Sequence, residues 1–205
     1  MKIKKKLNAI VFTDIAGFTK ISSKDETYAL SLLDKQREIL QPIVKKYNGN
    51  WLKEIGDGLL LSFTSSLEAV ECSIEIQNKL SNESSINIRV GIHQGDIFIK
   101  DNDIFGDDVN IASRIESFSP IGGVCISDKV KKDISSNPEI KTQYIGYRKL
   151  KGVGQDTKIY CINNKNLNVY KKQWLPYITG FLLMGLGIFG GTLATIMTIM
   201  ETDMT

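Results

Sequence analysis

Residues 11–19 read Val-Phe-Thr-Asp-Ile-Ala-Gly-Phe-Thr, and this stretch decides how the rest of the chain is interpreted. The apolar run over residues 9–12 predicts a buried strand covering residues 8–13. That strand leads directly into Asp14, and a Gly-Phe-Thr turn follows it. An acid in this position has two explanations. It is either a turn or helix N-cap residue, which is common after a strand, or a ligand at the edge of a sheet.

A second acid, Asp57, lies in the tip of a predicted hairpin formed by residues 51–55 and 59–63. If these strands neighbour the first one, Asp14 and Asp57 converge at one end of the sheet. Two ionised carboxylates side by side repel each other and favour a bound cation. Oxygen ligands without histidine or thiolate suit Mg²⁺ or Mn²⁺. The glycines on both sides of Asp57 permit the close backbone approach that a phosphate requires.

The remaining pattern predicts an α+β sandwich, with helices packed on a mostly antiparallel sheet. Helical periodicity and capping signals alternate with short runs of strand-forming residues. The predicted helices cover residues 26–47, 65–80 and 109–118, with a small helix from residue 128, and the predicted strands cover residues 86–93, 95–99, 124–127, 144–150 and 158–162.

Composition excludes several classes of function. A net charge of +3 over 205 residues, with a pI of about 8.6, is too small to indicate nucleic-acid binding. Three cysteines far apart and one histidine do not support a disulfide framework or a Cys/His zinc site. A reducing cytoplasm is the expected environment for such a chain.

Residues 174–200 predict a single membrane-spanning helix. The segment has no charged side chain, and as a helix it would reach roughly 40 Å, enough for a hydrocarbon core of about 30 Å. A buried core helix is the alternative, but the length, the five glycines and the absence of a polar face argue against it. Lysines between residues 163 and 173 precede the segment, and Glu201 and Asp203 follow it. This asymmetry predicts a single-pass membrane protein whose main domain is cytoplasmic.

Five motifs in the main domain carry a resemblance to a known family. In chain order they are VFTDIAGFT, KEIGDGLLLSF, RVGIHQGD, DIFGDDVNIASRIES and LKGVGQDTKIY. Together they resemble the class III adenylate/guanylate cyclase catalytic domain of the bacterial, adenylate cyclase-like type. The resemblance covers roughly residues 8–162 and implies a ferredoxin-like sheet with helices on one side.

Composition and the resemblance together predict five parts of the chain. They are a basic N-terminal segment (1–7), a nucleotidyl cyclase catalytic domain (8–162), a polar basic linker (163–173), the transmembrane helix (174–200) and a short tail (201–205).

The resemblance also implies a role for individual residues. Metal-binding positions are matched by Asp14, Asp57 and the backbone of Ile15, and positions beside the metals and phosphates by Gly17, Phe18 and Thr19. Triphosphate-contacting positions are matched by Arg89 and Lys151, and the purine-reading pair by Lys53 and Asp103. Two catalytic positions are matched by Asn110, which orients the ribose, and Arg114, which stabilises charge at the transition state. Two Mg²⁺ or Mn²⁺ ions per site are implied.

The implied reaction converts ATP to 3′,5′-cyclic AMP and pyrophosphate, by attack of the ribose 3′-oxygen on the α-phosphorus. Lys53 donates and Asp103 accepts, which matches the edge of adenine, whereas guanine would present a carbonyl oxygen to the carboxylate. The family forms each site across a homodimer, and one chain here carries both sets of residues. A small-residue face with Gly187 and Gly191 suits helix pairing in the membrane, although glycine is frequent in such helices generally.

Three other interpretations stay open. The domain could be a catalytically silent nucleotide-binding regulator, a guanylate cyclase, or a non-enzymatic tail-anchored adaptor. A cyclase assay with ATP and GTP separates the first two from the leading interpretation. The adaptor interpretation predicts that Asp14→Ala changes nothing measurable.

Overall fold

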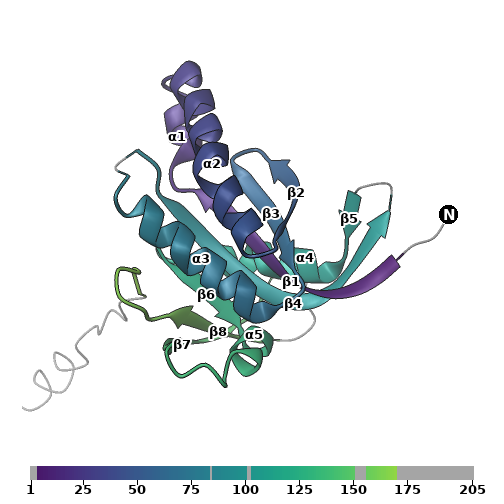
Figure 1. Ribbon diagram of the computed structural model, residues 1–205. Helices are drawn as coiled ribbons and strands as arrows, with labels where there is room; N and C mark the ends of the chain where they lie inside the picture. The colour runs from purple at the N-terminus through teal and green to yellow at the C-terminus, as the bar shows by residue number, and fades with distance from the viewer. Residues whose placement is uncertain (1–3, 84, 101–102, 151–155, 170–205) are drawn as a thin grey trace, which may run out of the picture. The chain divides into compact units, whose positions relative to one another are not determined.

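The computed structural model describes residues 4–83, 85–100, 103–150 and 156–169 (Figure 1). Thirteen helices and strands are formed within these residues. In chain order they are β1 (Lys4–Ile15), α1 (Phe18–Ser22), α2 (Glu26–Lys46), β2 (Asn50–Ile55), β3 (Gly58–Phe63), α3 (Ser66–Leu80), β4 (Ile88–Lys100), β5 (Asp103–Phe105), α4 (Asp107–Glu116), β6 (Val124–Ser127), α5 (Asp128–Asp133), β7 (Thr142–Arg148) and β8 (Thr157–Ile162).

The strands form one sheet in the order β2-β3-β1-β4-β6-β8-β7, and β5 pairs with β4 outside this path. β1 lies between β3 and β4 and is antiparallel to both. Among the described strands, β4 and β6 form the one parallel pair. The prediction of an α+β fold with a mostly antiparallel sheet is therefore confirmed.

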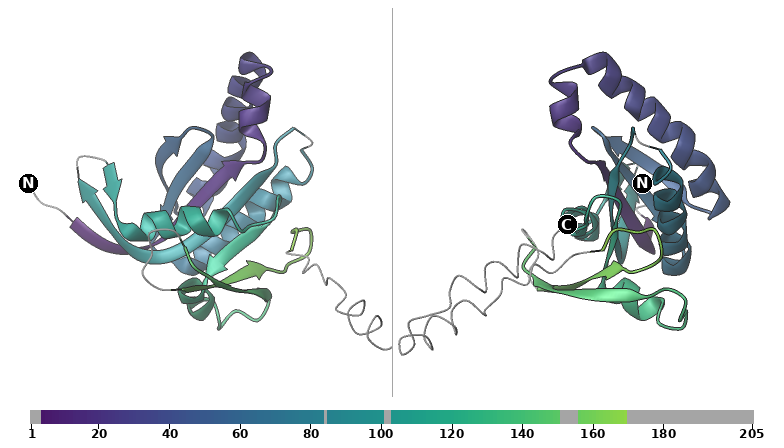
Figure 2. Two further views of the ribbon diagram at one scale, coloured as in Figure 1. Left: turned by 180° about the vertical axis from the view of Figure 1, so that it is seen from behind. Right: turned by 90° about the vertical axis from the view of Figure 1, so that its left-hand side faces the viewer.

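Helices cover both faces of the sheet. On β1, Ala9 and Val11 pack into the main core beneath α2 and α3, while Ile10 packs with Ala112 of α4 on the other face. Figure 1 shows α3 in front of the sheet and α4 behind it, and the view from behind in Figure 2 brings α4 to the front. The implied arrangement with all helices on one side is thus wrong for α4. The continuous apolar run in β1 explains this, because a strand that is apolar on both faces needs cover on both.

Most predicted elements are present with boundaries within a few residues of those expected. Helix α2 matches the prediction for residues 26–47, and the Asp25 carboxylate caps it by accepting the Tyr28 N–H at 2.8 Å. Helix α3 begins after Ser65, whose hydroxyl accepts the Glu68 N–H at 3.3 Å. Only this half of the predicted capping box is seen, because the Glu68 carboxylate accepts a hydrogen bond from Asn48.

Two boundaries differ from the prediction. β1 begins at Lys4, so residues 4–7 belong to the domain and not to a separate basic segment. Residues 88–100 form one strand, β4, where two were expected. The cause is shared, because Lys4–Leu7 pairs with Asp96–Ile99 and the two strands extend each other.

The predicted membrane segment, residues 174–200, lies outside the described residues, as do Lys151 and residues 170–173 of the linker. Within the part of the chain that the structure describes, no helix has the length and apolar character needed to cross a bilayer.

Candidate active site

Asp14 and Asp57 meet at one end of the sheet. Asp14 stands near the C-terminal end of β1, directly opposite Arg89 of β4. Asp57 lies in the turn between β2 and β3, and β3 is the other neighbour of β1. The backbone N–H of Ile15 donates a hydrogen bond to Asp57 Oδ2 at 3.0 Å. The predicted convergence of the two carboxylates is therefore present within a single chain.

The turn that carries Asp57 lies directly on β1. A Cβ atom at Gly58 would lie 3.0 Å from the carbonyl oxygen of Thr13, so a larger residue there would push the turn away from β1. On the other side, the Gln36 side chain of α2 donates to the carbonyl oxygen of Asp57 at 3.4 Å. The position of Asp57 is consequently set by contacts from two elements, β1 and α2.

The electrostatics of this pair favour a cation. Partial burial, the charge of Asp57 and a hydrogen bond to Asp57 together raise the pKa of Asp14 to about 6, against the lowering effect of Arg89. The Arg89 guanidinium lies 3.8 Å from Asp14 Oδ2, which is a loose ion pair. One arginine does not compensate two carboxylates. The site thus has oxygen ligands and an excess of negative charge, and this fits a hard divalent ion.

The described residues contain no group of three or more His, Cys, Asp or Glu side chains arranged to hold a metal ion. The candidate metal site therefore consists of Asp14 and Asp57, together with the backbone of Ile15 and, when substrate is bound, phosphate oxygens. Magnesium commonly binds in this way, with one or two carboxylates plus substrate phosphates.

The expected Gly-Phe-Thr turn is only partly a turn. Gly17 lies in the turn that leads from β1 into α1, with a φ of 79°, in the left-handed region that favours glycine. Phe18 and Thr19 are the first two residues of α1. The Phe18 ring packs against the main core and holds the start of the helix there, and Thr19 is exposed.

The predicted base-reading residues lie on two strands that are in contact. Lys53 is exposed on β2, and Asp103 is the first residue of β5. β2 and β5 are in contact although one pairs with β3 and the other with β4. The fold therefore brings residues 50 apart in the sequence to the same region of the domain.

Asn110 and Arg114 are exposed on α4, one helical turn apart. Ala112 and Ile115, on the opposite side of the helix, are fully buried against the sheet. Among the described residues, no hydrogen bond or ion pair joins Asn110 or Arg114 to Asp14, Asp57 or Arg89. One chain thus assembles the acidic end of the site and presents the α4 pair to its surroundings.

Comparison with protein families identifies the family to which this domain belongs. The model for the adenylate and guanylate cyclase catalytic domain matches residues 3–164. The chain belongs to this family.

Relatives of this cyclase domain include proteins named for both nucleotides. A Rhizobium meliloti (strain 1021) protein named as a candidate adenylate cyclase is 34% identical over 173 residues, which cover 80% of this chain and 29% of that protein. The solved adenylate/guanylate cyclase/hydrolase from Silicibacter pomeroyi superposes with a TM-score of 0.73 at 30% identity, covering 78% of this chain and 98% of that one. The guanylate cyclase domain of RhGC from Catenaria anguillulae, solved with GTP, gives 0.70 at 27% identity, with coverage of 78% and 98%.

The chain spans less than half of the length of the curated relatives it matches. The similarity therefore covers the cyclase domain and not the other parts of those proteins.

Glu116 is a third acid at this site of the cyclase domain, and the sequence analysis missed it. Its side chain is buried, and its Oε1 has no hydrogen-bond partner. Burial and the charge of Asp14 together raise the pKa of Glu116 to about 7, against the lowering effect of the opposite charge of Arg89. The available signal was its place in the quoted motif, two residues after Arg114. Its burial could not be read from the sequence.

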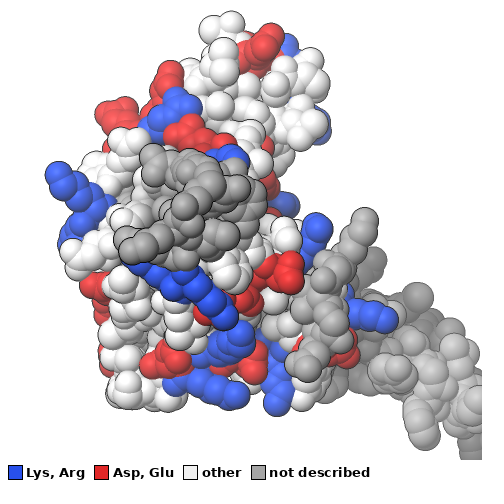
Figure 3. Space-filling model, turned by 90° about the vertical axis from the view of Figure 1, so that its right-hand side faces the viewer, with Lys and Arg blue, Asp and Glu red and all other residues white. Residues whose placement is uncertain are grey.

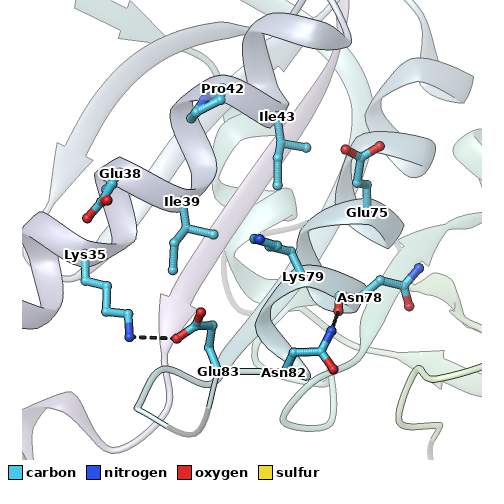
Figure 4. Close-up of a pocket in the computed structure, with 10 residues that line it drawn as sticks. All are labelled: Lys35, Glu38, Ile39, Pro42, Ile43, Glu75, Asn78, Lys79, Asn82 and Glu83. Atoms are coloured by element: carbon cyan, nitrogen blue, oxygen red, sulfur yellow. Dashed lines mark hydrogen bonds and ion pairs between the residues drawn. The ribbon is translucent and has the colours of Figure 1, made fainter.

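A cavity of about 650 Å³ lies between α2 and α3, away from these acids (Figure 4). An ion pair of 2.7 Å between Lys35 and Glu83 closes one side of it. Neither residue was assigned a role from the sequence. The residues lining the cavity are Lys35, Glu38, Ile39, Pro42, Ile43, Glu75, Asn78, Lys79, Asn82 and Glu83.

Charges on the face shown in Figure 3 are mixed. Basic and acidic side chains are interspersed over the visible part of this face. A nucleic-acid interface would instead require basic residues clustered on one face, so this view gives no support to such an interface.

Proposed function

We propose that this chain is an adenylate cyclase that converts ATP to 3′,5′-cyclic AMP and pyrophosphate. The observation that carries the proposal is the convergence of Asp14 and Asp57 beside Arg89, in a domain of the cyclase family. A nucleotide triphosphate is rich in the negative oxygens that such a site would bind through divalent ions.

Asp14, Asp57 and the backbone of Ile15 would hold Mg²⁺ or Mn²⁺, two ions per site. When bound, these ions neutralise phosphate oxygens and lower the pKa of the attacking hydroxyl group. Arg89 and Lys151 bind the outer phosphates through fixed positive charge, beside the backbone of the Gly17–Thr19 segment.

The remaining residues orient the nucleotide and stabilise its transition state. Asn110 positions the ribose so that its 3′-oxygen faces the α-phosphorus. Arg114 places a positive charge where negative charge develops as the new bond forms and pyrophosphate leaves. Their spacing on one face of α4 allows one helix to present both groups.

A homodimer with two equivalent sites would unite these groups. Support comes from the exposure of Asn110 and Arg114, which among the described residues form no hydrogen bond or ion pair with the acids of their own chain. In a head-to-tail dimer, each site takes its metal acids and Arg89 from one chain. Lys53, Asp103 and the α4 pair then come from the other chain.

ATP is favoured over GTP by the chemistry of Lys53 and Asp103. A lysine donor and a carboxylate acceptor pair with the ring nitrogen and amine of adenine, and the wrong base would leave buried polar groups unpaired. Guanylate cyclase is the second candidate, because a cyclase domain solved with GTP is similar to this chain. Competition of GTP against ATP decides between the two.

We also propose that residues 174–200 anchor the protein as a single membrane-spanning helix, with the catalytic domain on the cytoplasmic side. The support is the uncharged, apolar sequence and the lysines that precede it. A protease-protection assay on membranes, with epitopes at either end, tests both the span and its orientation.

The central test is an assay of the purified protein with Mn²⁺ and ATP at several protein concentrations. We expect cyclic AMP formation, with a specific activity that rises with concentration as dimers form. Binding of ATP without product at every concentration would favour the silent nucleotide-binding regulator instead.

A further inference from the structure

One carboxylate connects the N-terminus of α4 to β4 through hydrogen bonds. Asp108, the second residue of α4, lies with Oδ1 3.0 Å from Nε2 of His93. Its other oxygen, Oδ2, accepts the backbone N–H of Asp96 at 2.7 Å. Both carboxylate oxygens are therefore engaged with the same short segment of β4.

His93 is buried and acts as a neutral donor. Only 3% of His93 is exposed, and burial lowers its pKa. Its Nδ1 has no hydrogen-bond partner among the described residues. The ring proton is accordingly assigned to Nε2, which donates it to Asp108.

The segment of β4 beneath Asp108 leaves room for its carboxyl group. Gly95 lies between His93 and Asp96, and a Cβ atom at this position would overlap the carboxyl group of Asp108. Any other residue at position 95 would lift Asp108 away from the strand. Close approach of α4 to β4 at this point thus requires the glycine.

Asp108 is in a helix position that usually serves the helix itself. Acidic residues in a first turn stabilise a helix by interacting with its free N–H groups, and the N-cap here, Gly106, supplies no side chain. Asp108 nevertheless directs its carboxylate to β4 and not to the helix. Asp107, its neighbour, is exposed and makes no such contact.

The hydrogen bonds of Asp108 fix the position of the side chains that follow it on α4. Asn110 is two residues after Asp108, and Arg114 is six residues after it. Hydrophobic packing of Ala112 and Ile115 holds the helix on the sheet but tolerates small shifts along it. Towards its C-terminal end, α4 lies close against Gly91 of β4, where a Cβ atom would overlap the helix backbone. At the N-terminal end, the two directional hydrogen bonds of Asp108 fix the helix relative to β4.

We propose that Asp108 is a positioning residue, which together with His93 holds α4 so that Asn110 and Arg114 are correctly placed in the active site shared with the partner chain. This inference rests on the proposed function. Asp108 itself does not contact substrate, and its effect is exerted on a site whose metal acids belong to the other chain.

The test uses heterodimers, purified through two different tags, in which one chain carries Asp14→Ala. In such a dimer the working site combines the metal acids of the wild-type chain with α4 of the Asp14→Ala chain. Asp108→Asn is then added either to the Asp14→Ala chain or to the wild-type chain. Asn is isosteric with Asp, but its NH₂ group would face either the N–H of His93 or the backbone N–H of Asp96, and both of these groups are donors.

We expect the effect to depend on which chain carries the change. On the Asp14→Ala chain, Asp108→Asn should lower kcat by about tenfold, with KM for ATP within about twofold, because misplaced groups lose transition-state stabilisation. On the wild-type chain, it touches only the dead site and should change kcat by less than about twofold. Equal losses in both arrangements, a loss only on the wild-type chain, or no loss would overturn the proposal.

Two further variants keep the test decisive if Asp108→Asn does not fold. His93→Gln retains an N–H donor of similar reach, whereas His93→Leu removes it, so the Gln variant should retain more activity than the Leu variant. Asp107→Asn is the matched control and should have no effect in either chain. The heterodimer that carries Asp14→Ala and no further change should be active. If it is inactive, the proposal of a site shared between two chains is wrong, and this outcome is distinct from a failure of the role proposed for Asp108.

Discussion

The two ends of the proposed active site are built in opposite ways. The acidic end, with Asp14, Asp57 and Arg89, is assembled inside one chain from strands that pair directly. The α4 end presents Asn110 and Arg114 on an exposed helix face, and within the described part of the chain no hydrogen bond or ion pair joins them to those acids. Under the proposed function, this difference predicts that a single chain can bind the metal, whereas turnover requires a second copy.

Removal of a metal acid should have the largest effect. We expect Asp57→Ala to lower kcat at least about a hundredfold, because the cations that stabilise the phosphates lose one of two carboxylate ligands. The fold should persist, since Asp57 is a turn residue, and thermal unfolding would show this. Glu139→Ala, at an exposed acid away from the site, is the control. A variant that keeps most of its activity would contradict the metal assignment.

Mixing two inactive chains should restore activity. Asp14→Ala breaks the acidic end and Asn110→Ala breaks the α4 end, so a heterodimer retains one intact site of two. An equal mixture should then recover about one quarter of wild-type activity, since half of the dimers are mixed. The measurement is cyclic AMP formation after co-refolding or co-expression. No recovery, with heterodimers demonstrated by tag capture, would place both ends in the same chain's site.

Glu116→Gln should change how stability depends on pH in the metal-free protein. The folded pKa of Glu116, about 7, is above its ordinary value of 4.5, so the native state keeps a proton that the unfolded state loses. Stability is therefore complete below about pH 4.5 and is lost as pH rises toward 7, by up to about 3 kcal/mol. Glutamine stays neutral and avoids this loss.

The comparison is made by denaturant unfolding of both proteins at pH 5 and pH 8. The variant should gain stability relative to wild type at the higher pH. Asp14, whose pKa is also raised, and His93, whose lowered pKa acts in the opposite direction, are common to both proteins and largely cancel. A constant difference between the two proteins would show that Glu116 is already ionised in the folded state.

Substitution at the base-reading pair should have the smallest effect on rate and the clearest effect on specificity. Lys53→Ala should lower kcat/KM for ATP by about tenfold and change that for GTP less, because one directional donor to adenine is lost. Parallel assays with the two nucleotides measure the ratio. An unchanged ATP/GTP ratio would remove Lys53 from base recognition.

Much of the acidic end could be predicted from sequence because local signals coincide there. The run before Asp14 is apolar, and the hairpin around Asp57 has a glycine on each side. Antiparallel pairing of neighbouring strands then brings the acids together. The long β4 was predicted as two strands, because the polar residues at 93–96 interrupt its alternation. Their side chains serve different contacts: His93 binds Asp108 of α4, Gln94 binds Asp133, and Asp96 pairs with Lys5.

The sequence by itself determined the family, the order of helices and strands, and the identity of the residues available for nucleotide chemistry. These follow from motifs, periodicity and turn residues, which are local properties of the chain. Only the tertiary structure decided that α4 covers the second face of the sheet, that Glu116 is buried beside the acids, and that Asp108 binds His93. Each of these depends on which side of a helix faces the sheet and how closely the backbones approach, and those distances are set by packing between segments far apart in the chain.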